Sequence, residues 1–72
     1  MWIKINSGDI VDVSGKVVVA SRTGSVKAMD FSGNHFELGR YMFQPTAERI
    51  VSDIFEAIEH GDKVYEMPQG VE

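Results

Sequence analysis

The chain has 72 residues, 43% of them hydrophobic and 25% charged, with a net charge of −4 at pH 7. These values predict one ordered domain near the lower size limit for a stable apolar core. The chain contains no cysteine, which excludes disulfides, thiolate catalysis and cysteine-ligated metal centres. The basic residues are scattered along the chain, so the pattern predicts no nucleic-acid partner. No segment approaches the ~20 apolar residues of a membrane span, and the start does not resemble a signal peptide. We therefore expect a cytoplasmic protein without a membrane partner.

Short β-like runs separated by glycine-containing turns precede residue 42, a spacing typical of an antiparallel meander. The runs cover residues 1–6, 10–13, 16–22, 25–31 and 35–41. Alternation in the first run places Ile3 and Ile5 on the core side. The three valines at 17–19 indicate a central strand that is partly covered on both sides. The run 25–31 has two alternating sets, and its register leaves open which set faces inward.

One amphipathic helix is predicted from Thr46 to His60. Thr46 is a good N-cap residue after Pro45, and Gly61 suits the left-handed position that ends many helices. At about 100° per residue, one face of this segment is apolar. It consists of Ala47, Ile50, Val51, Ile54, Ala57 and Ile58.

The predicted fold class is α+β, an antiparallel β-meander of four to five strands with one C-terminal amphipathic helix packed on one face. Residues 1–67 form a single domain that includes a last short strand at 63–67, and residues 68–72 form a frayed tail. Phe36 and Leu38 should point at the helix. The predicted core contains Ile3, Ile5, Val17, Val19, Phe36, Leu38, Ile50, Val51, Ile54 and Ile58.

No residue pattern in the chain predicts catalysis. His35 and His60 are the only imidazoles, and neither has a neighbouring sequence that indicates a catalytic or ligand role. Asp9 and Asp12 do not have the spacing of a calcium loop, and the glycines match no phosphate-binding motif. We therefore predict that the protein is not an enzyme and has no metal and no cofactor.

The polar side of the helix region is rich in acidic residues. It could mimic nucleic-acid phosphates or attract a basic partner, although a solvated face is the simpler interpretation. The acidic residues concerned are Glu48, Asp53, Glu56, Glu59 and Asp62.

Four aromatic residues are candidates for a protein interface. Trp2, Tyr41, Phe43 and Tyr65 lie at the chain start, around the connection into the helix, and near the chain end. A small core can leave some of these four side chains uncovered, and exposed aromatic residues are typical anchors of protein contacts. The alternative is that they close the two ends of the core, and the sequence does not distinguish these two interpretations.

The layout resembles a group of small uncharacterised proteins of Gram-positive bacteria and their phages. The resemblance rests on the segment Glu37-Leu38-Gly39-Arg40-Tyr41, on the helix TAERIVSDIFEAI, and on the ending Tyr65-Glu66-Met67-Pro68. It implies a phage or mobile-element setting, in which small acidic proteins often bind a host or phage protein. It implies no catalytic residues.

Our leading functional hypothesis is a non-enzymatic protein-interaction module with a protein partner, with a homodimer as one form. The alternative is a protein that binds or sequesters a small, nucleotide-like ligand, motivated by the aromatic residues and by Arg22 and Arg40.

Overall fold

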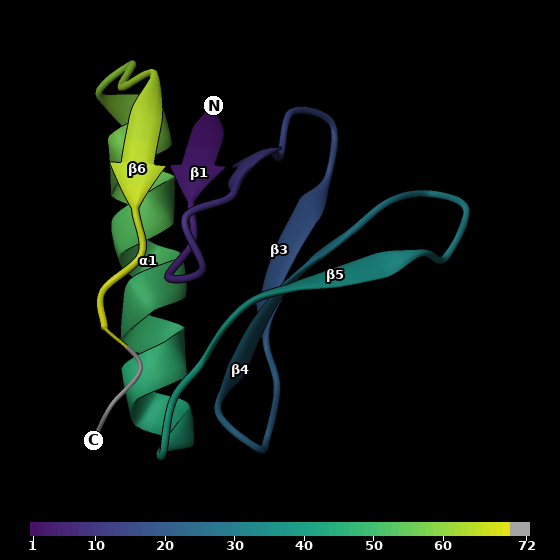
Figure 1. The fold of residues 1–72 in the computed structure, drawn as a ribbon, viewed down its shortest axis with the longest axis vertical. Helices are drawn as coiled ribbons and strands as arrows, with labels where there is room; N and C mark the ends of the chain where they lie inside the picture. The colour runs from purple at the N-terminus through teal and green to yellow at the C-terminus, as the bar shows by residue number, and fades with distance from the viewer. Residues whose placement is uncertain (70–72) are drawn as a thin grey trace.

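The computed structural model describes residues 1–69 and contains two small sheets and one helix (Figure 1). The first sheet has the order β2-β1-β6, and the second has the order β3-β4-β5. This arrangement confirms the predicted α+β class. The elements are β1 (Trp2–Lys4), β2 (Ile10–Asp12), β3 (Val17–Ala20), β4 (Ser25–Met29), β5 (His35–Arg40), α1 (Gln44–Glu59) and β6 (Val64–Glu66).

The strands are divided between two sheets and do not form one continuous meander. β3, β4 and β5 form the antiparallel meander, while β1 pairs antiparallel with β2 and parallel with β6. Parallel neighbours need a long connection between them, and here the chain passes through β2 to β5 and α1 before β6 returns beside β1. The short strand predicted at 63–67 is therefore present, and it completes the sheet that the first strand begins.

The helix begins two residues earlier than predicted. Phe43 occupies the N-cap position in an extended conformation (φ −123°, ψ 143°), and Pro45 lies in the first turn. The first N–H groups of a helix have no partner inside the helix, so proline loses nothing there and its fixed φ suits the turn. The prediction that Thr46 caps the helix is therefore wrong.

The predicted helix end at Gly61 is confirmed. Gly61 has a φ of +77°, and its N–H donates to the Ile58 carbonyl at 3.0 Å. The Asp62 N–H donates to the Ala57 carbonyl at 3.0 Å. This pair of bonds is the Schellman arrangement, which satisfies carbonyls that the helix leaves unpaired at its end.

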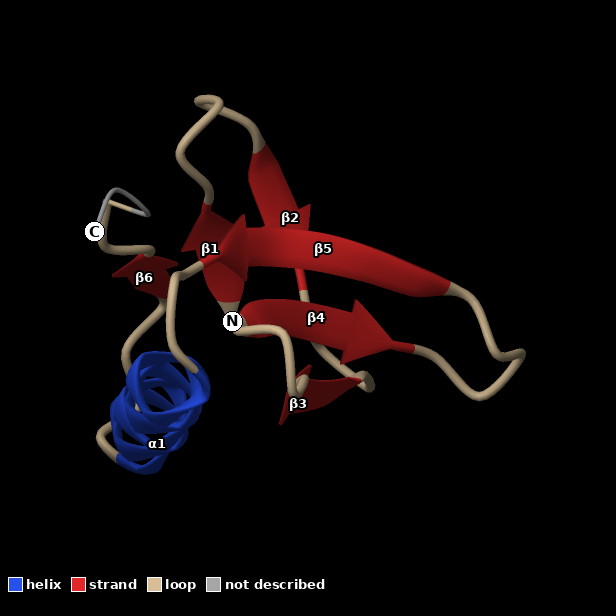
Figure 2. Ribbon diagram, turned by 90° about the horizontal axis from the view of Figure 1, so that it is seen from below, coloured by secondary structure: helices blue, strands red, loops and turns tan. Residues whose placement is uncertain are grey.

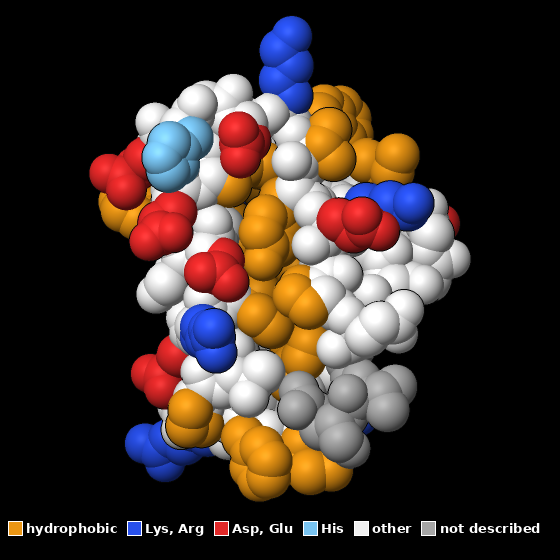
Figure 3. Space-filling model, turned by 90° about the vertical axis from the view of Figure 1, so that its left-hand side faces the viewer, with side chains coloured by type: hydrophobic (Ala, Val, Ile, Leu, Met, Phe, Trp, Pro, Cys, Tyr) orange, Lys and Arg blue, Asp and Glu red, His pale blue; other side chains and the backbone are white. Residues whose placement is uncertain are grey.

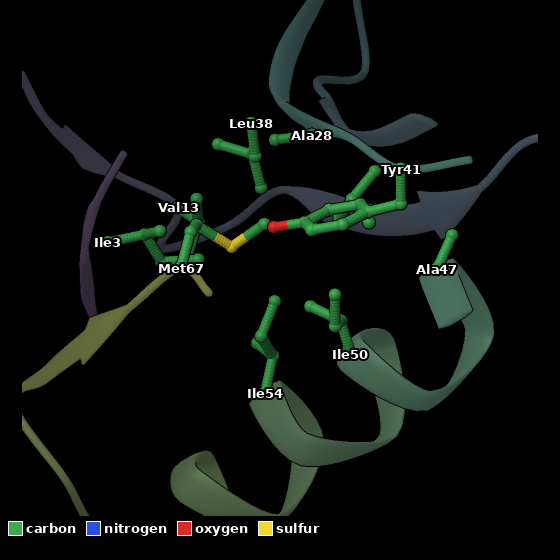
Figure 4. Close-up of a cluster of buried hydrophobic side chains, with 10 residues drawn as sticks. Ile3, Val13, Ala28, Leu38, Tyr41, Ala47, Ile50, Ile54 and Met67 are labelled. Atoms are coloured by element: carbon green, nitrogen blue, oxygen red, sulfur yellow. The ribbon is translucent and has the colours of Figure 1, made fainter. Parts of the chain in front are cut away.

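The core lies between α1 and the two sheets, and Tyr41 crosses its centre (Figure 4). The Tyr41 side chain is 2% exposed, and its hydroxyl donates to the Pro68 carbonyl at 2.9 Å. A buried phenol needs such an acceptor, because an unpaired hydroxyl would lose its hydrogen bonds to water. The buried cluster consists of Ile3, Val13, Val26, Ala28, Leu38, Tyr41, Ala47, Ile50, Ile54 and Met67.

Four predicted core residues, Ile3, Leu38, Ile50 and Ile54, are confirmed as buried. Ile5 and Val51 are partly buried against this cluster.

Val17, Phe36 and Ile58 were predicted in the core, but each is exposed. In β3, Val18 lies opposite the buried Ala28, and this register turns Val17 and the half-buried Val19 to the outer face of the sheet. Phe36 also pairs with Ala28, but it is the second residue of β5, next to the turn of the β4–β5 hairpin, and it is 45% exposed. Ile58 lies beside the buried stripe of the helix, which is Ala47, Ile50, Ile54 and Ala57.

The start of the predicted frayed tail is held by the rest of the chain. The Pro68 carbonyl accepts hydrogen bonds from the Tyr41 hydroxyl and from Asn6 Nδ2, the latter at 3.1 Å. Residues 70–72 of that predicted tail lie outside the described residues.

Candidate protein-interaction surface

Trp2 and Tyr65, two of the four candidate aromatic residues, lie on neighbouring strands but on opposite faces of their sheet. Trp2 pairs with Val64, and Tyr65 pairs with the fully buried Ile3. Residues that are adjacent in a strand point to opposite faces, so Trp2 lies on the outer face and Tyr65 on the core face. Trp2 is 48% exposed, while Tyr65 is partly buried against the core cluster.

Partial burial raises the pKa of the Tyr65 phenol above its ordinary value of 10.0, and the nearby carboxylate of Asp53 raises it further. Both effects disfavour the phenolate, through lost hydration and through repulsion between like charges. Tyr65 therefore faces the helix and contributes to the core more than to an exposed surface.

Tyr41 and Phe43, the other two candidates, also lie in different environments. Tyr41 is buried, so the interpretation that places it in the core applies to it and the interface interpretation does not, because this small core uses its ring as a central filler. Phe43 is exposed where the chain enters α1, and Figure 1 shows this connection at the end of the molecule opposite β1. The structure therefore does not bring the four aromatic residues together into one surface.

The charged side of α1 faces outward. Figure 3 shows acidic and basic side chains over the helix, with an apolar strip between the helix and β6. Asp53, Glu56, Glu59 and Arg49 are all exposed. This arrangement fits a solvated helical face.

A groove runs between α1 and β3, two elements that lie side by side in Figure 2. It contains two hollows of about 170 and 350 Å³, and Val51 lines both of them. The first hollow is lined by Lys16, Val18, Val51, Ile54, Phe55 and Ile58. The second is lined by Val19, Ala20, Glu48, Val51 and Ser52. We call this feature the α1/β3 groove.

The α1/β3 groove is mainly apolar, and each of its ends carries one charge. Phe55 and Ile58, which line it from the helix, are 60% and 51% exposed. Lys16 lies at the end that Phe55 lines, and Glu48 lies at the end that Ala20 lines. The groove thus has an apolar centre with opposite charges at its two ends.

The free edge of β3 borders this groove. β3 is the first strand in the order β3-β4-β5, so among residues 1–69 its only neighbour in the sheet is β4. Its sequence VVVA contains no charged residue, whereas the other edge strands, IVD, HFELGR and VYE, each contain at least one ionisable residue. Edge strands are usually protected from further pairing by charges, prolines or bulges. The edge of β3 has no charge or proline within it.

The described residues contain no group of three or more His, Asp or Glu side chains that could hold a metal ion. Within residues 1–69, no helix has the length and apolarity that crossing a membrane requires.

Nothing matches this chain among family models, curated proteins or solved structures. The resemblance to small proteins of Gram-positive bacteria and their phages therefore stays a prediction, and the function has to be argued from the geometry.

Sequence reasoning did not identify the α1/β3 groove. One signal was present, because Phe55 is a large apolar residue next to the predicted apolar face of the helix. The second signal, the uncharged valine run of β3, was interpreted as a covered central strand. Only the sheet order shows that this run lies at an edge.

Proposed function

We propose that this domain is a non-enzymatic protein-interaction module whose partner adds an extended strand to the free edge of β3. The observation that carries the proposal is the combination of an uncharged edge strand with an apolar groove, in which Phe55 and Ile58 are more than half exposed.

Strand addition uses both features of this surface. Backbone hydrogen bonds to a sheet edge supply affinity, and alternate side chains of the added strand enter neighbouring pockets and supply specificity. Here one side of the added strand would cover Val51, Phe55 and Ile58 of the groove. The other side would continue the outer face of the sheet beside Val17 and Val19.

A small anionic ligand fits the groove less well. Lys16 and Glu48 lie at its opposite ends, so the lining has no cluster of positive charge. Neither arginine behind the nucleotide hypothesis lines the groove. Arg40 lies 3.3 Å from the carboxylate of Glu37, and Arg22 lies in the turn between β3 and β4.

Site-specific photocrosslinking in the cells that encode the chain tests the proposal. We would replace Phe55 with a photocrosslinking phenylalanine analogue and identify the captured proteins by mass spectrometry. The matched control places the same analogue at Phe31, which is 94% exposed in the β4–β5 turn and remote from the groove. We expect a protein that is captured from position 55 and not from position 31.

A second substitution establishes whether capture depends on the groove. Ile58→Lys adds charge to the groove and should abolish the capture, whereas Val64→Lys, at a similarly exposed position on β6, should leave it intact. Equal capture from positions 55 and 31, or capture that survives Ile58→Lys, would exclude the proposed surface. Loss with Val64→Lys alone would move the interface to the sheet that contains Trp2.

A further inference from the structure

We infer that the strand added to β3 is β3 of a second copy of this chain, so that two copies form a symmetric dimer. This inference rests on the proposed function and names its partner. The pattern of hydrogen bonds at the edge, the charges at the ends of the groove and the exposed apolar side chains of α1 support it.

The free edge presents the backbone groups of Val18 and Ala20. The Ser21 N–H donates to the Ser25 carbonyl at 2.8 Å, so Ser21 directs its backbone groups toward β4. In an antiparallel pair, alternate residues direct their groups to the same neighbour. Val19 and Val17 therefore also face β4, and the N–H and C=O groups of Val18 and Ala20 face the free edge.

A twofold axis through Val19 uses all of these free groups. It places Val18 of one copy opposite Ala20 of the other, and each of these pairs exchanges both of its hydrogen bonds. An axis through Val18 would instead place Ala20 opposite Lys16. The Lys16 N–H already donates to the Val13 carbonyl at 3.1 Å, so that register would use fewer bonds. The hydrogen-bond pattern therefore selects the axis through Val19.

The same axis brings opposite charges together. A twofold rotation reverses the direction of the groove, so the end with Lys16 in one copy meets the end with Glu48 in the other. The same register places Lys16 opposite Arg22 of the other copy, which lies in the tight turn that the Gly24 N–H closes on the Ser21 carbonyl. The Glu48 carboxylate at that end of the groove offsets the repulsion between these two cations. Complementary charges in these positions favour the antiparallel register and the association of like chains.

Dimerisation would also cover apolar side chains that the single chain leaves exposed. The two helices lie on the same side of the joined sheet, and Phe55 and Ile58 of each copy lie along the side that faces the other helix. A domain of this size buries only about 60% of the surface that its unfolded chain exposes, so it gains core by pairing. The joined structure contains one continuous sheet made from two three-stranded sheets.

Sedimentation equilibrium of the purified chain over about 1 μM to 1 mM, with charge-reversed variants, tests this inference, since weak complexes have Kd values in this range. We expect a dimer for the unmodified chain. Glu48→Lys should raise the dimer Kd by about tenfold or more, because it leaves Lys16 of the other copy among positive charges only, and adding Lys16→Glu to this variant should reverse the effect. The double variant should return the Kd to within about threefold of the original, which an effect on folding alone would not do.

Lys63→Glu and Glu59→Lys reverse exposed charges that do not line the groove, so they serve as matched controls and should leave the Kd unchanged. Circular dichroism of every variant checks that the fold is retained. A monomer at the highest concentration overturns the inference, as does a dimer whose Kd is unaffected by Glu48→Lys or is not restored in the double variant. Such a result leaves the proposed function standing if position 55 still captures a different protein, so the two failures are distinguishable.

Discussion

Replacing Gly24 with alanine should destabilise the fold by about 2–5 kcal/mol, from a conformational cost and a steric cost together. Gly24 has a φ of +91°, in the left-handed region, where an L-residue costs roughly 1–2 kcal/mol. A Cβ atom at this position would also overlap the backbone oxygen of Tyr41 and lie 3.1 Å from its carbonyl carbon. Such overlap in a packed region costs typically about 1–3 kcal/mol. The steric cost arises because the Gly24 carbonyl accepts a 2.9 Å hydrogen bond from the Tyr41 N–H, which holds the two backbones together.

Gly33→Ala separates these two costs. Gly33 has a φ of +90°, almost identical to that of Gly24, but a Cβ atom there would have no heavy atom within 4 Å. Alanine also restricts the unfolded chain, and this effect is the same in both variants. In urea denaturation followed by circular dichroism, we therefore expect Gly24→Ala to lose about 1–3 kcal/mol more than Gly33→Ala. Equal losses would refute the close approach of Gly24 and Tyr41.

Three further predictions test the core. Ile54→Ala should lower the free energy of unfolding by about 2–5 kcal/mol, whereas Ile58→Ala, at an exposed site one turn away, should cost less than about 1 kcal/mol in the same urea assay. Tyr41→Phe should cost about 0.5–1.5 kcal/mol in that assay, because it removes the buried hydroxyl that donates to a backbone carbonyl. Folding raises the pKa of the Tyr65 phenol, so the unfolded chain loses its phenolic proton at a lower pH than the folded chain does. The free energy of unfolding should therefore fall as pH rises beyond 10.0. Ultraviolet titration of the phenol should show that Asp53→Asn lowers this pKa without returning it fully to the ordinary value, because burial is the larger cause.

The helix was largely predictable because its signals are local. The apolar spacing identified the face that contains the buried Ala47, Ile50, Ile54 and Ala57, and Gly61 provides the left-handed position that ends the helix. Its start was predicted wrongly because two local signals compete within two residues. Thr46 can cap a helix, and Pro45 can begin one, and the chain uses the proline.

The register of β3 was not predictable, because it depends on residues distant in sequence. Three successive valines do not alternate, so the run itself does not indicate which side chains face the core. The choice comes from β4, where Val26 and Ala28 are buried and pair with Ala20 and Val18. The parallel pairing of β1 with β6 is non-local in the same way, since it joins the two ends of the chain.

The candidate interface was sought among the aromatic residues, but a small core needs its largest side chains for packing. Tyr41 shows this most clearly, because its ring lies at the centre of the core. The apolar surface that remains uncovered instead belongs to the helix, whose apolar stripe is wider than the sheet beneath it can cover. Phe55 and Ile58 are the uncovered part of this stripe, and they border the edge strand that contains no charge. If Phe55 and Ile58 were exposed by chance, there would be no reason for the uncharged edge of β3 to lie beside them. An added strand accounts for both features at once, because its backbone would satisfy the edge and its side chains would cover the helix.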